Sequence, residues 1–201
     1  MNTTAGVRLP AAERRAQLLA MACRLFARDG YRGASMEAIA EAAGVTKPVL
    51  YQHFSSKHAL CNDLLGSELA RLEGALDEAL AQAGDNAERL RRGFGAYLDF
   101  VDARSDAFRV LFTEALGVDD AFQRRVARFR QWVAGRVATI IRAETGLPES
   151  RAEALAAAIV GMAEGAATWW LSGDRPLPAA ELADELAALA WKGFARFPGP
   201  A

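Results

Sequence analysis

Residues 35–54 read SMEAIAEAAGVTKPVLYQHF, and this stretch decides what the amino-terminal part of the chain can fold into. Ser35 is a preferred helix N-cap residue, and the apolar residues that follow it recur at helical spacing. Gly44 can adopt the positive φ that ends a helix, and Thr46 is a second N-cap candidate shortly after it. The stretch therefore predicts two short helices joined by a tight glycine turn, which is a helix-turn-helix.

The second of these helices is predicted to have one buried and one exposed face. At about 100° per residue, Leu50 and Phe54 lie on the same side and are expected to face the core. Pro48, Tyr51 and Gln52 then point outward. The second helix of a helix-turn-helix can lie in the major groove of DNA, so this outward face is the candidate for reading bases.

The outward side chains have the chemistry that base reading needs. Pro48 offers apolar surface to a thymine methyl, Gln52 can hydrogen-bond an adenine edge, and Lys47 can reach a guanine or a phosphate. Phosphate contacts are expected from donors that flank this helix and from the free amides at two helix starts: Thr46, Tyr51, His53 and Lys57, with Ser35 and Ser56.

A different interpretation is open from the spacing alone. A three-helix module with a glycine turn also occurs in proteins that bind no DNA, and Lys47 and Lys57 are then ordinary solvated charges. The outward Tyr51 favours a surface that meets a ligand, because an exposed aromatic ring builds no core. His53 and His58 are poorly spaced for one helix face, and no acid or cysteine completes a ligand set. No metal and no cofactor are expected.

Charge and composition support a nucleic-acid-facing amino-terminal part. The first 60 residues hold eight basic and four acidic residues, whereas the remainder holds sixteen basic and twenty-one acidic residues. The chain has 201 residues, of which 52% are apolar and 24% charged, so it is expected to fold as one large domain or two small ones. It carries no GxGxxG, P-loop, HExxH or GxSxG motif, and an enzyme is not expected.

Cellular location is predicted from what the sequence lacks. The longest stretch without a charged residue spans residues 154–163, far short of the ~20 residues that cross a bilayer. The first twenty residues lack the apolar run of a secretory signal. Cys23 and Cys61 are too few for a disulfide framework and are expected to be free thiols. These observations predict a cytoplasmic protein without a membrane partner.

Residues 14–60, RRAQLLAMACRLFARDGYRGASMEAIAEAAGVTKPVLYQHFSSKHAL, resemble the amino-terminal DNA-binding domain of the TetR/AcrR transcriptional regulators. The matching parts occur in order: a first helix that ends LFARDGY, the capped ASMEAIAEAAGV and the segment TKPVLYQHFSSKHAL. Gln52 falls on a variable position, and Pro48 stands where many members have Gly or Ala. The resemblance implies DNA-contacting positions at Thr46, Lys47, Pro48, Tyr51, His53 and Lys57.

The whole chain reads as helix, with about nine helices and no credible strand pair. We expect a helix-turn-helix domain over residues 1–55, in which residues 1–9 form a flexible arm. A long helix from Lys57 to about residue 83 is expected to link it to the rest. The resemblance implies that residues 56–201 form an all-helical domain that binds a small effector and dimerises through its last two long helices.

The last two helices carry the residues for such an interface. Small residues at three and four spacings let another helix approach closely, and leucines line one side of the final helix. Packing inside one protomer is the alternative. The candidate interface residues are Ala154, Ala158, Gly161, Gly165, Leu182, Leu186 and Leu189.

Large apolar residues between these elements predict a cavity for a mostly hydrophobic molecule. A filled core explains any single one of these residues equally well, so the cavity is predicted only from the residues taken together. That set comprises Phe94, Tyr97, Phe108, Phe112, Trp132, Met162 and Trp169, with a few polar neighbours such as Glu114 and Glu164.

The sequence thus predicts a homodimeric repressor that a small hydrophobic effector releases from an inverted-repeat operator on double-stranded DNA. A transcriptional activator of the same fold is the first alternative. A ligand-carrier protein without DNA binding is a second, and it would lack a salt-sensitive affinity for DNA.

Overall fold

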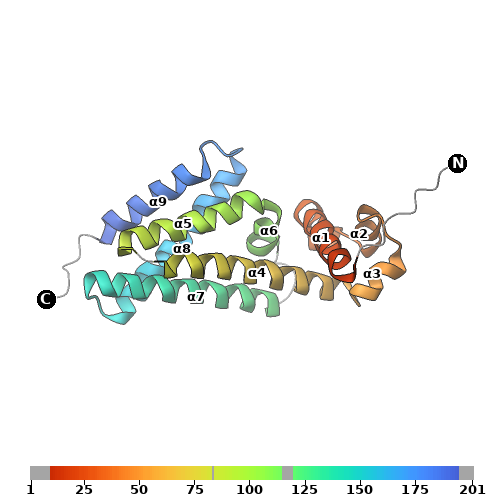
Figure 1. Cartoon of the computed structure of the whole chain (residues 1–201), viewed down its shortest axis with the longest axis horizontal. Coiled ribbons are helices and arrows are strands. Elements are labelled where there is room, and N and C mark those ends of the chain that lie inside the picture. Colours follow the sequence, from red (N-terminus) through yellow and green to blue (C-terminus); the bar gives the residue numbers. More distant parts are fainter. Residues whose placement is uncertain (1–9, 83, 115–119, 195–201) are drawn as a thin grey trace.

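The structure is a computed structural model that describes residues 10–82, 84–114 and 120–194. Regular structure in these ranges is entirely helical, with nine α-helices and one π-helical segment, as predicted. The molecule is elongated. The first three helices occupy one end, and the long helices that follow form a bundle at the other (Figure 1). The predicted arm over residues 1–9 lies outside the described residues.

Three helices form the amino-terminal end: α1 (Ala11–Gly33), α2 (Met36–Ala42) and α3 (Lys47–His53). The Ser35 hydroxyl accepts a hydrogen bond from the Ala38 amide at 3.1 Å, and Gly44 has a φ of 65°, so the predicted cap and turn are confirmed. Gly30 has a φ of 71° and kinks α1 near its end, and the helix continues to Gly33.

Thr46 occupies the N-cap position of α3, but its hydroxyl makes no capping hydrogen bond. The prediction of a side-chain cap is therefore wrong. The Thr46 carbonyl instead accepts from the amides of Val49 and Leu50. Proline at position 48 has no amide hydrogen, so one of the donors that a cap would satisfy is absent.

The remaining helices follow in chain order. The predicted linking helix from Lys57 is confirmed as α4. The elements are α4 (Lys57–Ala81), α5 (Asn86–Ala103), α6 (Ser105–Arg109), the π-helical η1 (Val110–Glu114), α7 (Asp120–Thr145), α8 (Glu149–Ser172) and α9 (Ala179–Phe194).

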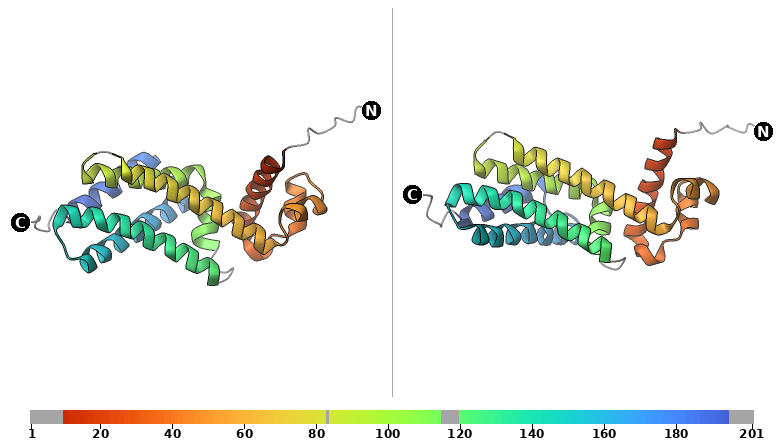
Figure 2. Two further views of the ribbon diagram at one scale, coloured as in Figure 1. Left: turned by 60° about the horizontal axis from the view of Figure 1, so that its bottom comes forward. Right: turned by 90° about the horizontal axis from the view of Figure 1, so that it is seen from below.

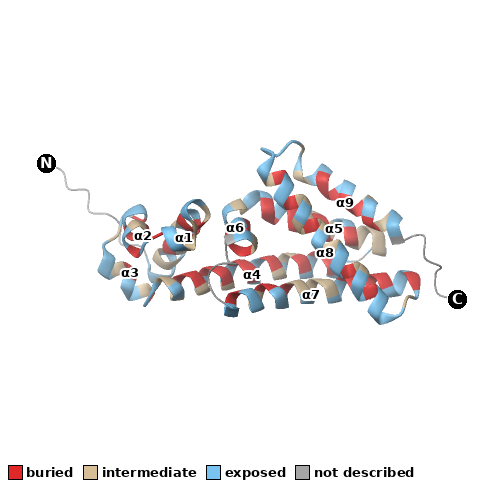
Figure 3. Cartoon of the chain, turned by 180° about the vertical axis from the view of Figure 1, so that it is seen from behind, coloured by how far each residue is buried: buried red, intermediate tan, exposed pale blue. Residues whose placement is uncertain are grey.

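Helix α4 leaves the helix-turn-helix and runs into the bundle alongside α7, as the two views of Figure 2 show. Helix α9 packs on α5, and α8 packs on α7. Buried residues follow the inner faces of α4 and α5, whereas α3 shows mostly exposed residues (Figure 3). One hydrophobic core connects both ends of the molecule, from Phe26 and Leu50 to Ile141.

Two sets of contacts join the amino-terminal helices to the bundle near α4. The short elements α6 and η1 pack against α1. Glu68 of α4, only 4% exposed, accepts hydrogen bonds from Arg104, one of them from Nε at 2.9 Å. Burial, and then the Glu68 carboxylate, raises the pKa of the nearby Cys23 thiol to about 12. The hydrophobic core therefore continues past residue 55. A domain boundary at that residue stays a prediction.

The cap of α4 gives a stability prediction. The Ser56 hydroxyl accepts from the Ala59 amide at 3.0 Å, so Ser56→Ala should lower the free energy of unfolding by about 0.5 to 2 kcal/mol. Urea unfolding followed by circular dichroism measures the change. Ser55→Ala is the matched control, because the adjacent Ser55 is exposed and caps no helix. Equal losses in the two variants would contradict the capping role.

Candidate DNA-binding surface and effector cavity

The faces of α3 lie as predicted. Leu50 and Phe54 are buried, whereas Pro48, Gln52 and Tyr51 are exposed, with 43% of Tyr51 accessible. Few large apolar side chains in the described residues are this exposed. Helix α3 lies at the end of the molecule away from the bundle (Figure 1).

Lys47 does not stand alone on this face. Its ammonium pairs with the carboxylate of Glu37 on α2 and lies 5.9 Å from the centroid of the Tyr51 ring. The hydrogen bond between the two side chains raises the pKa of Lys47 and lowers the pKa of Glu37. Local spacing gave no sign that Glu37 competes for the same lysine that is predicted to bind DNA.

Lys57 has a structural role that the sequence did not show. Its ammonium donates to the carbonyls of Tyr31 and Ala34, both at 2.9 Å, and lies 4.6 Å from the Tyr31 ring centroid. It therefore ties the turn between α1 and α2 to the start of α4. Two carbonyls more than twenty residues away give no signal in sequence spacing. The phosphate contact of Lys57 stays a prediction.

The other predicted contacts sit around the same end. His53 is half-buried beside Phe54, with ring centroids 6.4 Å apart, and Thr46 is exposed. Ser35 is engaged in its cap. Across the described part of the chain, no three His, Cys, Asp or Glu side chains gather closely enough to hold a metal ion.

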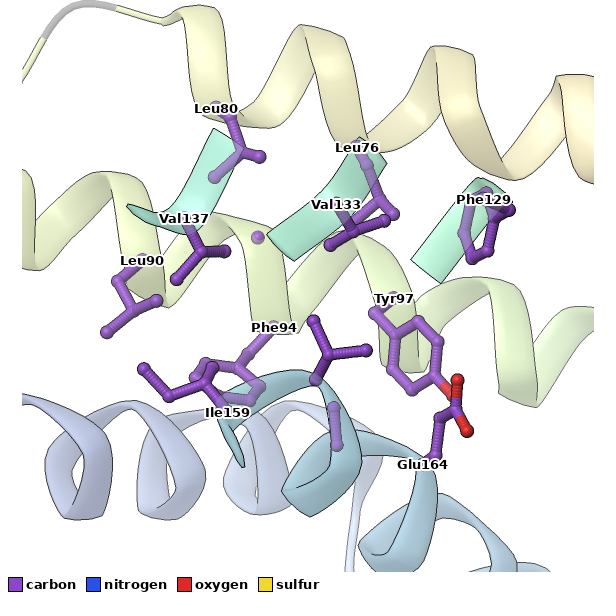
Figure 4. A pocket seen from close by; sticks show the side chains of 13 residues that line it. Leu76, Leu80, Leu90, Phe94, Tyr97, Phe129, Val133, Val137, Ile159 and Glu164 are labelled. Atoms are coloured by element: carbon purple, nitrogen blue, oxygen red, sulfur yellow. The ribbon is translucent and has the colours of Figure 1, made fainter. Parts of the chain in front are cut away.

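An apolar cavity lies inside the bundle between α4, α5, α7 and α8 (Figure 4). It contains about 510 Å³ of space free of protein atoms, part of it open to solvent. Phe94 and Tyr97 of the predicted set line it, together with the predicted polar neighbour Glu164. The remaining lining consists of Leu76, Leu80, Leu90, Gly93, Phe129, Val133, Val137, Ile159, Val160 and Ala163.

The other predicted cavity residues lie outside this lining. Phe108 is buried in contact with Tyr97, Phe112 packs on Phe108, and Trp132 stacks on Phe129. Met162 packs against the core, and Trp169 is 54% exposed. The sequence missed the aliphatic lining because a leucine or valine at helical spacing has the same pattern whether it faces a cavity or a packed neighbour.

Polar groups meet at one end of the cavity. The Tyr97 hydroxyl is buried and has no hydrogen-bond partner. Glu164 binds Arg130 through two hydrogen bonds, Nε to Oε1 at 2.7 Å and Nη2 to Oε2 at 2.8 Å. Burial, followed by the Glu164 carboxylate, raises the pKa of Tyr97 well above its usual value. Tyr97 therefore stays protonated and is available as a donor.

The predicted interface residues divide into two groups. Ala154, Ala158, Gly161 and Gly165 are exposed on α8, and a methyl group added at either glycine would meet no other atom within 4 Å. Leu189 is 62% exposed. Leu182 and Leu186 are instead buried inside the protomer, because the apolar side of α9 packs on α5, so their prediction as interface residues is corrected.

Helix α8 also corrects the expectation about membrane spans. Among the described residues it is the one helix long and apolar enough to cross a membrane, judged by length and composition only. The ten charge-free residues 154–163 gave too short a length for the apolar segment, because it continues past the single charge of Glu164. That charge is paired with Arg130, and α8 packs along α7. Only 22% of its apolar window is buried in the protomer.

Comparison with known proteins agrees with this geometry. The family described as "Bacterial regulatory proteins, tetR family" matches residues 18–64, and "Tetracyclin repressor-like, C-terminal domain" matches residues 87–193. The chain is 35% identical to the HTH-type transcriptional activator FasR of Mycolicibacterium smegmatis over 96% of this chain and 88% of that protein.

Solved structures share the fold. A TetR-like transcriptional regulator from Rhodococcus sp. RHA1 is 31% identical with a TM-score of 0.82, covering 94% of this chain and 100% of that chain. The regulator FadR from Bacillus subtilis, solved in complex with stearoyl-CoA, is 16% identical with a TM-score of 0.74 and covers 89% and 98% of the two chains. Regulators of this kind bind DNA and are not enzymes. The chain belongs to the TetR family of DNA-binding transcriptional regulators.

Proposed function

We propose that this regulator acts as a homodimer on an inverted-repeat operator and that a long, mostly hydrophobic molecule in the bundle cavity changes its affinity for DNA. The observation that carries the proposal is an apolar cavity between four helices of the bundle, in a chain whose other end exposes the proposed base-reading face of α3. A protein that binds operator DNA in bacteria works in the cytoplasm, which we propose as its location.

The exposed face of α3 supports sequence-specific binding. Pro48 and Gln52 are free to meet base edges, while Lys47 and Tyr51 lie beside them for phosphate or base contacts. Helix α3 enters the major groove in this proposal. A second copy related by a twofold axis presents the same helix again, so the site consists of two inverted half-sites.

The exposed strip of α8 supports the dimer. Ala154, Ala158, Gly161 and Gly165 let a partner helix approach closely, Trp169 follows one turn after Gly165 on α8, and Leu189 exposes apolar surface on α9. Pairing α8 and α9 of two copies in a four-helix interface would cover a helix that the protomer leaves largely exposed.

A hydrocarbon chain is the effector that the cavity fits best. Its walls are aliphatic and aromatic, and polar groups occur at only one end. FadR from Bacillus subtilis was solved with stearoyl-CoA, and another structure of the same fold is described as a fatty acid degradation regulator. These relatives support a long acyl chain as the effector class here.

Packing offers a route from the cavity to α3. Tyr97 of the cavity wall meets Phe108 edge-on at 6.4 Å, and Phe108 lies 5.1 Å from Phe112 of η1. Both α6 and η1 pack on α1, α1 packs on α2, and α2 packs on α3. An effector that moves Tyr97 can therefore shift the helix-turn-helix. Ligand and DNA must then change each other's affinity by the same factor.

The effect on transcription has two candidates. Repression is the prediction from the sequence, because an effector that weakens DNA binding then releases the gene. Activation is the second candidate, and it is favoured by the name of FasR, a transcriptional activator 35% identical to this chain. The position of the operator relative to the promoter, mapped together with transcription in vitro, separates them.

Selection of bound fragments from random DNA, followed by titration with acyl compounds, tests the proposed function. We expect an inverted repeat whose half-site centres lie one helical turn or a multiple of it apart, roughly 10 to 10.5 bp per turn. Saturating acyl ligand should change operator affinity, and operator should change ligand affinity by the same factor. An operator affinity that no bound acyl compound alters would contradict the effector role of the cavity.

Gln52 provides a test of base reading. Gln52→Ala should lose about 1 to 3 kcal/mol of binding free energy on the selected operator and much less on random DNA, because the side chain is exposed on α3 and carries no phosphate-binding charge. Fluorescence anisotropy at fixed salt measures both. Gln82→Ala, at the far end of α4, is the control. Equal losses of Gln52→Ala on both DNAs would remove Gln52 from base reading.

Removing the acidic partner of the Glu37–Lys47 ion pair should strengthen DNA binding. Glu37→Gln removes a carboxylate next to Lys47, so affinity should rise several-fold on operator and random DNA alike, and most at low salt. Glu73→Gln on α4 is a charge-matched control away from α3. Unchanged affinity at low salt would show that Glu37 does not face the phosphates.

The glycines of α8 test the dimer. The double variant Gly161→Gln and Gly165→Gln should fold, because open space surrounds both positions in the protomer, yet it should sediment as a monomer. It should also lose most of its operator affinity, since two half-sites no longer bind together. Gly74→Gln on exposed α4 surface is the matched control. A dimeric double variant would place the interface elsewhere.

A further inference from the structure

The cavity is apolar except at the end where Tyr97 and Glu164 approach each other (Figure 4). Tyr97 comes from α5 and Glu164 from α8, so two helices bring them together. Glu164 is fixed in place by its two hydrogen bonds to Arg130 of α7. Three helices thus converge on one small polar site in a wall of hydrocarbon.

The Tyr97 hydroxyl is the unsatisfied group of this site. It is buried and donates to no acceptor, although nearly all buried polar groups in folded proteins have a partner. The Glu164 carboxylate lies nearby and binds Arg130, but it accepts no hydrogen bond from the Tyr97 hydroxyl. An acceptor supplied by a molecule in the cavity would give the hydroxyl its missing partner.

The charge at this site restricts what that acceptor can be. Tyr97 stays protonated, because burial and the Glu164 carboxylate both raise its pKa. Glu164 lines the cavity whereas Arg130 is not part of its lining, so the carboxylate is the charge that a ligand beside Tyr97 would face, and the local field disfavours negative charge. An ionised carboxylate placed beside Tyr97 would meet this field in surroundings that screen it poorly. An uncharged oxygen has no net charge, so this field does not exclude it.

We propose that Tyr97 binds an uncharged acceptor oxygen of the effector, such as the carbonyl of an ester or thioester or the oxygen of an alcohol, and that Glu164 excludes ionised fatty acids. Arg130 acts as a positioning residue that holds the Glu164 carboxylate toward the cavity. The inference rests on the proposed function of the cavity as the effector site, and it defines the chemistry of the effector at its polar end.

Three ligands with the same hydrocarbon chain test the inference: methyl laurate, lauryl alcohol and laurate. Their binding to the full-length protein is measured by isothermal titration calorimetry at neutral pH, where laurate is ionised. We expect the ester and the alcohol to bind more tightly than laurate. Tyr97→Phe should weaken the ester and the alcohol by about 2- to 10-fold, the usual range for one uncharged hydrogen bond, and leave laurate nearly unchanged.

Glu164→Gln should have the reverse selectivity. It removes the negative charge and leaves the Arg130 guanidinium without its partner, so laurate should gain about 10-fold, the equivalent of one pKa unit of charge interaction. Tyr31→Phe is the matched control, because Tyr31 lies outside the cavity against Phe26, and it should bind all three ligands as the unmodified protein does. Thermal unfolding of each variant checks the fold.

The possible results separate the two proposals. If all three ligands bind and Tyr97→Phe affects them equally or not at all, the role of Tyr97 is overturned while the cavity remains the effector site. If laurate binds the unmodified protein as tightly as the alcohol does, the exclusion by Glu164 is overturned. If none of the three ligands binds, the hydrocarbon effector itself is wrong, and this inference fails with it.

Discussion

The apolar stripe of α4 is the constraint on which the rest of the structure depends. Its first half buries Leu60 and Leu64 in the core that also holds α1 and α3, and its second half buries Leu72 and Leu76 within the bundle. A continuous helix bends little between two packed ends. The position of the helix-turn-helix is therefore linked to the packing of the bundle, and a change at either end must be accommodated at the other.

The junction beside α4 contains polar contacts that fix this geometry. Lys57 holds the turn between α1 and α2, and the buried Glu68 pairs with Arg104 at the start of α6. Breaking a buried ion pair by removing one partner leaves an uncompensated charge, so such contacts favour a small number of discrete arrangements. A regulator needs that property, because its DNA-binding and released states must be distinct.

Charge on the DNA face and polarity in the cavity follow the same physical rule. In the proposals made above, Glu37 reduces the attraction of Lys47 for phosphate, and Glu164 reduces the attraction of the cavity for anions. In each case a carboxylate placed next to a binding group limits indiscriminate affinity. Specificity then depends on uncharged contacts, such as those proposed for Gln52 and Tyr97, which an incorrect partner cannot replace.

The sequence by itself determined the elements and the faces of the amino-terminal part. The caps, the glycine turn and the buried side of α3 depend on residues within a few positions of each other, so local spacing predicts them. It could not show that Lys57 reaches the Tyr31 carbonyl, that Leu186 is buried within the protomer, or that the Tyr97 hydroxyl is left without a partner. Those facts depend on how helices distant in sequence pack, and helical periodicity states which residues are apolar without stating which neighbour, cavity or second copy they face.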